Sequence, residues 1–129
     1  MAEAYEKEMR DVLGEDVSLD LVLLGMGPDG HTCSLFPNHA LLGETKRLVA
    51  HIEDSPKLPP KRITLTFPTL SRSKRIAFVT AGSSKAPILP QVLAKGSKLP
   101  AGRAVAKDGT ATWFVDKDAA SKLGLGGKI

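Results

Sequence analysis

The stretch Leu19-Asp20-Leu21-Val22-Leu23-Leu24, followed by the loop Gly25-Met26-Gly27-Pro28-Asp29-Gly30-His31-Thr32, carries the strongest structural signal in this chain. A short and nearly continuous apolar run is typical of an inner strand of a parallel sheet. Glycines directly after such a strand let the backbone turn sharply and approach a ligand closely. Ligands of open α/β sheets bind at the loops that leave the carboxyl ends of the strands. The stretch therefore predicts an α/β fold with a candidate site at residues 25–32.

The rest of the chain continues the alternation of strands and helices. A short helical turn is expected at residues 34–36, and three prolines at 54–60 predict a rigid, extended connection. No internal repeat or long linker divides the chain, so the pattern indicates one α/β domain. The other expected elements are strands at 48–52, 62–67, 75–80 and 112–115, and helices at 4–13, at 116–123 and after the turn at 81–85.

Individual residues refine the expected helices. In the helix after residue 85, Pro87 suits the first turn, whereas Pro90 is expected to remove a hydrogen bond and to kink the helix. Asp116 is a favourable N-cap for the last helix. The apolar face of the first helix is expected to consist of Tyr5, Met9, Val12 and Leu13.

Composition excludes several classes of protein. The 129 residues are 42% hydrophobic and 25% charged, as in an ordinary globular domain. No apolar run approaches the roughly 20 residues that cross a bilayer, so no membrane partner is expected. The net charge of +4 comes from scattered basic residues, and aromatic residues make up 5%, which argues against a nucleic-acid partner. The single Cys33 and the polar residues 1–10 favour a cytoplasmic protein without disulfides.

Asp29 and His31 are the residues of the loop best suited to chemistry. A carboxylate two residues from a histidine orients the imidazole or stabilises its protonated form, as general acid–base catalysis requires. The bare pattern is equally compatible with a tight turn that exposes a histidine. Neither a dinucleotide fingerprint nor a P-loop is present.

Other candidates for chemistry are weaker. His39 and His51 are too irregularly spaced from His31 for a compact metal site, so no metal is expected. A lone cysteine such as Cys33 is more often a buried apolar residue than a nucleophile. Ser34 lies in no nucleophile-elbow motif, and Trp113 is expected in the core.

The segment from Leu23 to Pro37 resembles the signature segment of the 6-phosphogluconolactonase family. Further blocks resemble the family in the same order, so the likeness covers nearly the whole chain. These blocks are Asp54-Ser55-Pro56-Lys57, Pro59-Pro60 with Arg62-Ile63-Thr64-Leu65-Thr66, Gly82-Ser83-Ser84-Lys85-Ala86, and Thr112-Trp113-Phe114-Val115-Asp116 with Ala119-Ala120.

The resemblance implies a modified Rossmann-like fold, a mainly parallel sheet with flanking helices. It implies hydrolysis of a small-molecule sugar-phosphate lactone, 6-phospho-D-glucono-1,5-lactone, in the oxidative pentose phosphate pathway, with no metal or organic cofactor. His31 matches the catalytic histidine, Asp29 would orient it, and Lys85 matches a lysine suited to phosphate. Gly27 and Gly30 are expected to contact substrate through the loop backbone, and the loop N–H groups to face a developing oxyanion. Arg62 is either a further positive charge in the pocket or a solvated residue at a strand end.

The chain resembles only the C-terminal half of the family domain. Residues 1–129 are therefore expected to be the C-terminal part of one larger domain, with the flank of the sheet exposed. The family's N-terminal phosphate loop is not found, so little or no lactonase activity is expected of this chain alone. Two alternatives stay open: a phosphosugar isomerase or deaminase of the same fold, and a non-catalytic half-domain. The oligomeric state is left undetermined.

Overall fold

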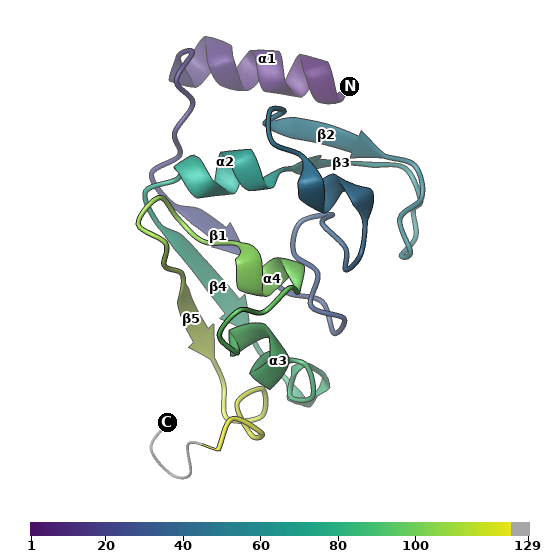
Figure 1. Ribbon diagram of the computed structural model, residues 1–129, viewed down its shortest axis with the longest axis vertical. Coiled ribbons are helices and arrows are strands. Elements are labelled where there is room, and N and C mark those ends of the chain that lie inside the picture. The colour runs from purple at the N-terminus through teal and green to yellow at the C-terminus, as the bar shows by residue number, and fades with distance from the viewer. Residues whose placement is uncertain (125–129) are drawn as a thin grey trace.

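A three-stranded parallel sheet forms the centre of the computed structural model, which describes residues 1–124 (Figure 1). It has the order β1-β4-β5, with β1 at Val22–Leu24, β4 at Ile76–Thr80 and β5 at Thr112–Val115. Both strand pairs are parallel, and Val22 is paired with Ile76 and Ala77 with Thr112. This arrangement confirms the predicted α/β fold.

Strands β2 (Val49–Ile52) and β3 (Arg62–Leu65) form a separate antiparallel pair. Helix α1 (Ala2–Leu13) lies against β2. The Glu6 carboxylate accepts the backbone N–H groups of Leu48 and Val49 at 2.6 and 3.1 Å, so one side chain attaches the helix to this strand.

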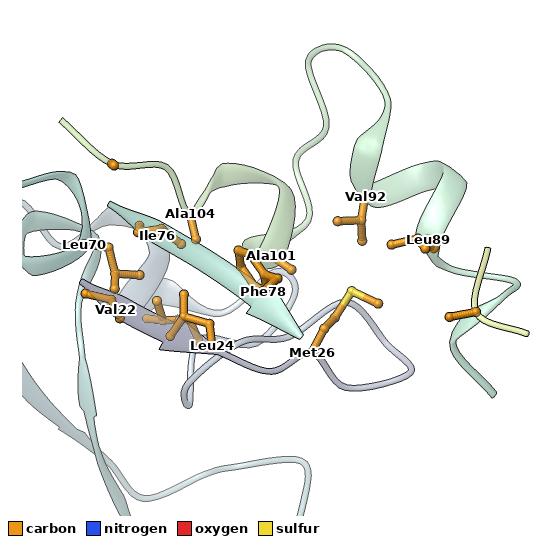
Figure 2. Packing of buried hydrophobic residues seen from close by; sticks show 13 residues of the cluster. Val22, Leu24, Met26, Leu70, Ile76, Phe78, Leu89, Val92, Ala101 and Ala104 are labelled. Atoms are coloured by element: carbon orange, nitrogen blue, oxygen red, sulfur yellow. The ribbon is translucent and has the colours of Figure 1, made fainter. Parts of the chain in front are cut away.

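Short helices close one face of the parallel sheet. Phe78 is fully buried beneath them, and Trp113 on the next strand stacks on it at 4.0 Å, which confirms Trp113 as a core residue. Figure 2 shows the sheet residues gathered with Leu70, Ala101 and Ala104. None of the helices in the described residues is long and apolar enough to span a membrane. The short helices are α2 (Phe67–Arg72), α3 (Leu89–Leu93), α4 (Pro100–Arg103) and the 3-10 turns η1 (Ala40–Gly43) and η2 (Ser83–Lys85); α2 and α4 were not predicted.

The predicted strand at 19–24 is shorter and less buried than expected. Its paired residues begin at Val22, and β1 is an edge strand within the described part of the chain. Leu21 and Leu23 are 53% and 68% exposed, because nothing described covers that face of the sheet. The expectation of an inner strand is therefore wrong for this chain as described, while the expected exposed flank is present.

Two predicted helices differ from the structure. The predicted apolar face of α1 is wrong, because its Tyr5, Val12 and Leu13 are exposed and the helix meets β2 through Glu6 instead. Residues 116–123 form turns rather than a helix, although Asp116 caps the first turn as predicted by accepting the Ala119 N–H at 2.8 Å.

The expected kink at Pro90 is also absent. Helix α3 begins at Leu89, so Pro90 lies in the first turn, where its missing N–H would have no partner in the helix. Pro87 lies in the turn before the helix rather than in its first turn.

Two predicted connections take a different form. Ser34 and Leu35 belong to a β-turn over residues 32–35 rather than to a helical turn; the Leu35 N–H closes it by donating to the Thr32 carbonyl at 2.9 Å, and Phe36 follows the turn. Residues 54–60 double back instead of running extended, with the Ser55 N–H donating to the Pro60 carbonyl at 3.1 Å. The reversal is required because β2 and β3 are antiparallel neighbours.

The predicted strand 62–67 is present as β3, and alternate side chains from Thr64 to Thr66 point inward. Thr64 and Thr66 point inward and are 5% and 0% exposed, whereas Ile63 is 38% exposed. The buried hydroxyls serve backbone groups: Thr64 Oγ1 accepts the Ser34 N–H at 3.0 Å, and Thr66 Oγ1 donates to the Leu48 carbonyl at 3.1 Å. Polar side chains thus face inward here because adjoining segments bury backbone N–H and C=O groups that need hydrogen-bond partners.

Candidate active site

The loop after β1 is held in shape by its own hydrogen bonds. The Gly27 N–H donates to the His31 carbonyl at 2.9 Å, and the Gly30 N–H donates to the Gly27 carbonyl at 3.0 Å. The Thr32 hydroxyl closes the loop by donating to the Gly25 carbonyl at 2.8 Å. Residues 25–32 therefore form a closed, pre-shaped turn at the carboxyl end of a strand, where the sequence placed the site.

Asp29 and His31 form the central pair of this loop. His31 Nδ1 lies 2.5 Å from Asp29 Oδ1, and the His31 backbone N–H donates to the same oxygen at 3.1 Å. Burial of the Asp29 carboxyl opposes its ionisation, but the hydrogen bonds from His31 outweigh burial and lower the pKa of Asp29. The Asp29 carboxylate thus fixes the orientation of the His31 ring and leaves Nε2 as the ring nitrogen available for proton transfer.

Gly27 makes room for this pair. A Cβ atom on Gly27 would lie 2.1 Å from Cε1 of His31, far inside contact distance. Gly30 has φ +86°, a left-handed conformation that favours glycine, and a Cβ there would lie 3.3 Å from Leu99. The two glycines have these steric roles, and their N–H groups are donated within the loop. The N–H groups of these two glycines are thus occupied in this conformation, whereas an oxyanion contact by other N–H groups of the loop and contact of Gly27 and Gly30 with substrate stay predictions.

Lys85 joins the loop after β4 to the loop after β1. It lies at the end of η2, and its Nζ donates to the Met26 carbonyl. The adjacent Gly82 N–H donates to the Asp116 carboxylate at 3.1 Å, and Gly82 has φ 96°. The structure therefore brings Lys85 to the Asp29–His31 loop and adds Asp116 as a support.

Arg62 and His31 both contact the ring of Phe36. The Phe36 ring contacts the His31 ring, with centroids 4.7 Å apart, and the Arg62 guanidinium lies 5.5 Å from the Phe36 centroid. Arg62 donates through Nε and Nη2 to the carbonyls of Pro59, Lys57 and Leu58 at 2.9 to 3.0 Å. Its observed contacts hold the loop between β2 and β3, and a contact with substrate stays a prediction.

The other candidate residues have structural roles. His39 Nε2 lies 2.8 Å from Asp54, and its Nδ1 accepts the Leu41 N–H at 3.0 Å. His39 and His51 line a separate cleft of about 500 Å³ that includes neither Asp29 nor His31. No three potential metal ligands gather anywhere in residues 1–124. Burial raises the pKa of Cys33 to about 11, as expected of an unreactive thiol.

Sequence reasoning missed three supports of the site. Thr64 accepts the Ser34 N–H and donates to the Leu65 carbonyl, Phe36 contacts both His31 and Arg62, and Leu99 packs on Gly30. The sequence shows Thr64 within an expected strand and Phe36 within the signature segment. Their roles could not be predicted, because the residues that they contact are distant in the sequence. Leu99 gave no such signal.

Residues 1–113 match the family model described as glucosamine-6-phosphate isomerases/6-phosphogluconolactonase. The chain belongs to this family. The 6-phosphogluconolactonase of Rattus norvegicus is 46% identical over 127 residues, which cover 96% of this chain and 49% of the rat protein. The family resemblance drawn from the sequence is therefore confirmed, and the chain spans about half the length of the curated relatives it matches.

Solved structures of the family share the fold. The 6-phosphogluconolactonase of Trypanosoma brucei has a TM-score of 0.76 at 31% identity, covering 95% of this chain and 52% of that one. A monomeric glucosamine-6-phosphate deaminase has a lower TM-score, 0.68, at 26% identity, covering 94% and 53%. The chain is thus more similar to this lactonase than to this deaminase.

Proposed function

We propose that this chain carries the proton-transfer part of a 6-phosphogluconolactonase site, which in the complete family domain hydrolyses 6-phospho-D-glucono-1,5-lactone to 6-phosphogluconate. The observation that carries the proposal is the 2.5 Å contact between His31 Nδ1 and Asp29 Oδ1. Both residues lie in the segment that resembles the signature of the 6-phosphogluconolactonase family. The proposal includes the view that residues 1–129 are the C-terminal part of one larger domain. A cytoplasmic location belongs to it too, supported by the unpaired Cys33.

In the proposed reaction, Nε2 of His31 takes a proton from water as the water oxygen attacks the lactone carbonyl. The carbonyl oxygen becomes an oxyanion in the tetrahedral intermediate. When the carbonyl re-forms, the bond to the ring oxygen breaks, and the imidazolium gives its proton to that oxygen. Asp29 stabilises the imidazolium between the two steps, because its lowered pKa keeps it ionised.

The phosphate group is assigned to Lys85. One ammonium hydrogen is directed at the Met26 carbonyl, which leaves two donors for phosphate oxygens. Arg62 is proposed as a weaker contributor, since its Nε and Nη2 already donate to loop carbonyls. No metal, organic cofactor, nucleic acid or membrane is part of the proposal.

The test compares two proteins. One is this chain alone, and the other is a joined protein in which this chain is connected to the part of the rat relative that it does not span. Lactone hydrolysis is followed by the appearance of 6-phosphogluconate, with glucosamine 6-phosphate as the control substrate. The joined protein is expected to hydrolyse the lactone but not to deaminate the control, and Lys85→Met is expected to raise its KM more than it lowers kcat.

A non-catalytic half-domain is the second candidate, and the half-length match to relatives favours it for the chain alone. Little or no turnover is therefore expected without the joined part. Robust turnover by the chain alone, lost in His31→Ala, would contradict this expectation. Deamination of the control substrate would contradict the lactonase proposal.

A further inference from the structure

The phenyl ring of Phe36 contacts both the imidazole of His31 and the guanidinium of Arg62. The centroids of the Phe36 and His31 rings are 4.7 Å apart with a tilt of 38°, and Cζ of Arg62 lies 5.5 Å from the Phe36 centroid. A phenyl ring attracts a cation to its face and packs favourably on other aromatic rings. One buried ring thus links two groups that the proposed function treats as independent.

Strand β3 positions both Phe36 and Arg62. Arg62 and Thr64 are two residues apart on this strand, so their side chains leave it on the same face. Thr64 Oγ1 accepts the N–H of Ser34 at 3.0 Å, which attaches the turn before Phe36 to the strand. The Phe36 carbonyl in turn accepts the His39 N–H at 3.2 Å. The backbone that carries the Phe36 ring is therefore held on both sides.

The Arg62 side chain is immobilised by the loop between β2 and β3. Its Nε donates to the Pro59 carbonyl at 3.0 Å, and its Nη2 donates to the carbonyls of Lys57 and Leu58 at 2.9 Å each. Three carbonyl partners fix the plane of the guanidinium, because its donors form a rigid fork. Arg62 is therefore a fixed cover over the Phe36 ring rather than a mobile surface cation.

The plane of the His31 ring needs more than one restraint. Asp29 holds Nδ1 at 2.5 Å, but the outer torsion of a histidine has a broad and roughly two-fold preference. A ring packed beside the imidazole restricts this torsion, and Phe36 supplies that contact. Nε2 has to point at the attacking water, and a misplacement of about 1 Å can lower a rate by about 100-fold. Phe36 is thus placed to affect kcat.

We propose that Phe36 is a positioning residue for the reaction and that Arg62 acts on His31 through it. Phe36 holds the plane of the His31 ring, and Arg62 holds Phe36. This inference rests on the proposed role of His31 and deepens it, because it gives Arg62 an effect on kcat beside its weak contact with phosphate.

Phe36→Leu in the joined protein removes the ring but keeps an apolar side chain. The kcat for lactone hydrolysis is expected to fall by about tenfold with little change in KM, because ring orientation is altered and phosphate binding is not. Phe67→Leu is the matched control, since the Arg103 guanidinium lies 4.5 Å from the Phe67 centroid in a similar pair formed by α2 and α4. It is expected to lower Tm and to leave kcat unchanged. Equal losses of kcat in the two variants would overturn the proposal.

A double-mutant cycle tests whether Arg62 acts through Phe36. Arg62→Met alone is expected to lower kcat by about threefold, and in the Phe36→Leu background to lower it no further. Its effect on KM is expected to be the same in both backgrounds. Arg103→Met is the control and is expected to leave kcat unchanged. The same fractional loss of kcat from Arg62→Met in both backgrounds would show that Arg62 acts independently of Phe36 and would overturn this part of the proposal.

Solvent exchange of the His31 Nδ1–H proton, followed by NMR in the chain alone, tests the positioning without any turnover. Exchange is expected to be about tenfold faster in Phe36→Leu and in Arg62→Met, because a ring that turns more freely opens its hydrogen bond more often. The two control variants are expected to match the unsubstituted chain. Unchanged exchange in Arg62→Met, whose side chain lies outside the core, would overturn the proposal even where Phe36→Leu does not fold.

The two readouts separate the inference from the proposed function. If the joined protein lacks lactonase activity while exchange responds to Phe36→Leu and Arg62→Met, the proposed hydrolysis is wrong and the contact that holds His31 is supported. If lactonase activity is present but kcat is the same in Phe36→Leu as in the unsubstituted protein, the positioning role is overturned and the proposed function stands.

Discussion

The imidazole of His31 occupies the volume that a side chain at Gly27 would need. A Cβ atom at position 27 would lie 2.1 Å from Cε1 and 2.2 Å from Nδ1 of His31, and 3.0 Å from Oδ1 of Asp29. The hydrogen bond between Asp29 and His31 therefore depends on the absence of a side chain four residues before the histidine.

Gly27→Ala is expected to displace the His31 ring and break its bond to Asp29. In the joined protein, kcat/KM is expected to fall by about 100-fold, because small misplacements of a catalytic group have effects of this order. Gly25→Ala is the control, since a Cβ there meets nothing within 4 Å. The check is the downfield proton NMR signal of Nδ1–H together with kcat/KM. An unchanged signal in Gly27→Ala would refute the steric role.

His31→Ala is expected to lower kcat of the joined protein by about 10²- to 10⁴-fold with little change in KM, because it removes proton transfer rather than binding. Asp29→Asn keeps the size of the side chain and removes its charge, so a smaller loss of kcat is expected. His39→Ala is the matched control, as its contact with Asp54 lies outside the site. A comparable loss of kcat in His39→Ala would contradict the assignment.

Cys33 is expected to resist thiol reagents at neutral pH. Its pKa, raised by burial to about 11, leaves roughly one thiolate in a thousand at pH 8. The labelling rate of the unsubstituted chain, measured from pH 7 to 10.5, is expected to rise throughout this range. A half-maximal rate near pH 9 with a plateau above about pH 10 would show an ordinary thiol.

Asp116→Ala is expected to loosen the loop that carries Lys85. The Asp116 carboxylate accepts the N–H groups of Ala119 and Gly82, and these two bonds lower its pKa below the ordinary value of 3.8. Faster amide exchange at Gly82 and a lower Tm at neutral pH are therefore expected. Asp118→Ala, two residues further on, is the control and is expected to change neither.

The stabilisation of the fold by the Asp116 carboxylate should decrease as the pH falls. A carboxylate with a lowered native pKa stabilises the fold above its unfolded pKa and loses this contribution as the pH falls through the native value. The Tm difference between Asp116→Ala and the unsubstituted chain should therefore be full at neutral pH, shrink as the pH falls past 3.8, and vanish only below the lowered native pKa. A difference that persists at lower pH would show that the charge is not its cause.

Thr64→Val is expected to reduce the free energy of unfolding by about 1–3 kcal/mol. The near-isosteric change leaves the Ser34 N–H without its acceptor in a buried position. Thr64→Ser keeps the hydroxyl and is expected to cost less. Urea denaturation of the three proteins measures the difference, and equal losses for Val and Ser would indicate that packing rather than the hydrogen bond matters.

The sequence correctly predicted the strands β4 and β5 and the position of the loop at residues 25–32. Apolar runs and glycines are features of residues that are close together in the chain, so they can be recognised without the tertiary structure. The sequence mispredicted helix 116–123, where a good N-cap is followed by turns, and it missed the short helices α2 and α4. A helix of four to six residues has little intrinsic stability and forms where packing on the sheet favours it. The inward positions of Thr64 and Thr66 were missed for a similar reason, since their backbone partners come from distant segments.

The sequence by itself determined the family, the α/β class and the Asp29–His31 pair, because these depend on residues adjacent in the chain. The tertiary structure decided the rest. It directed Lys85 to the Met26 carbonyl, placed Arg62 over the Phe36 ring, and gave Gly27 its steric role beside His31. It also left Leu23, Val79 and Phe114 exposed on one face of the sheet. Such contacts join segments far apart in the chain, so they exist only once the strands have set the loops beside one another.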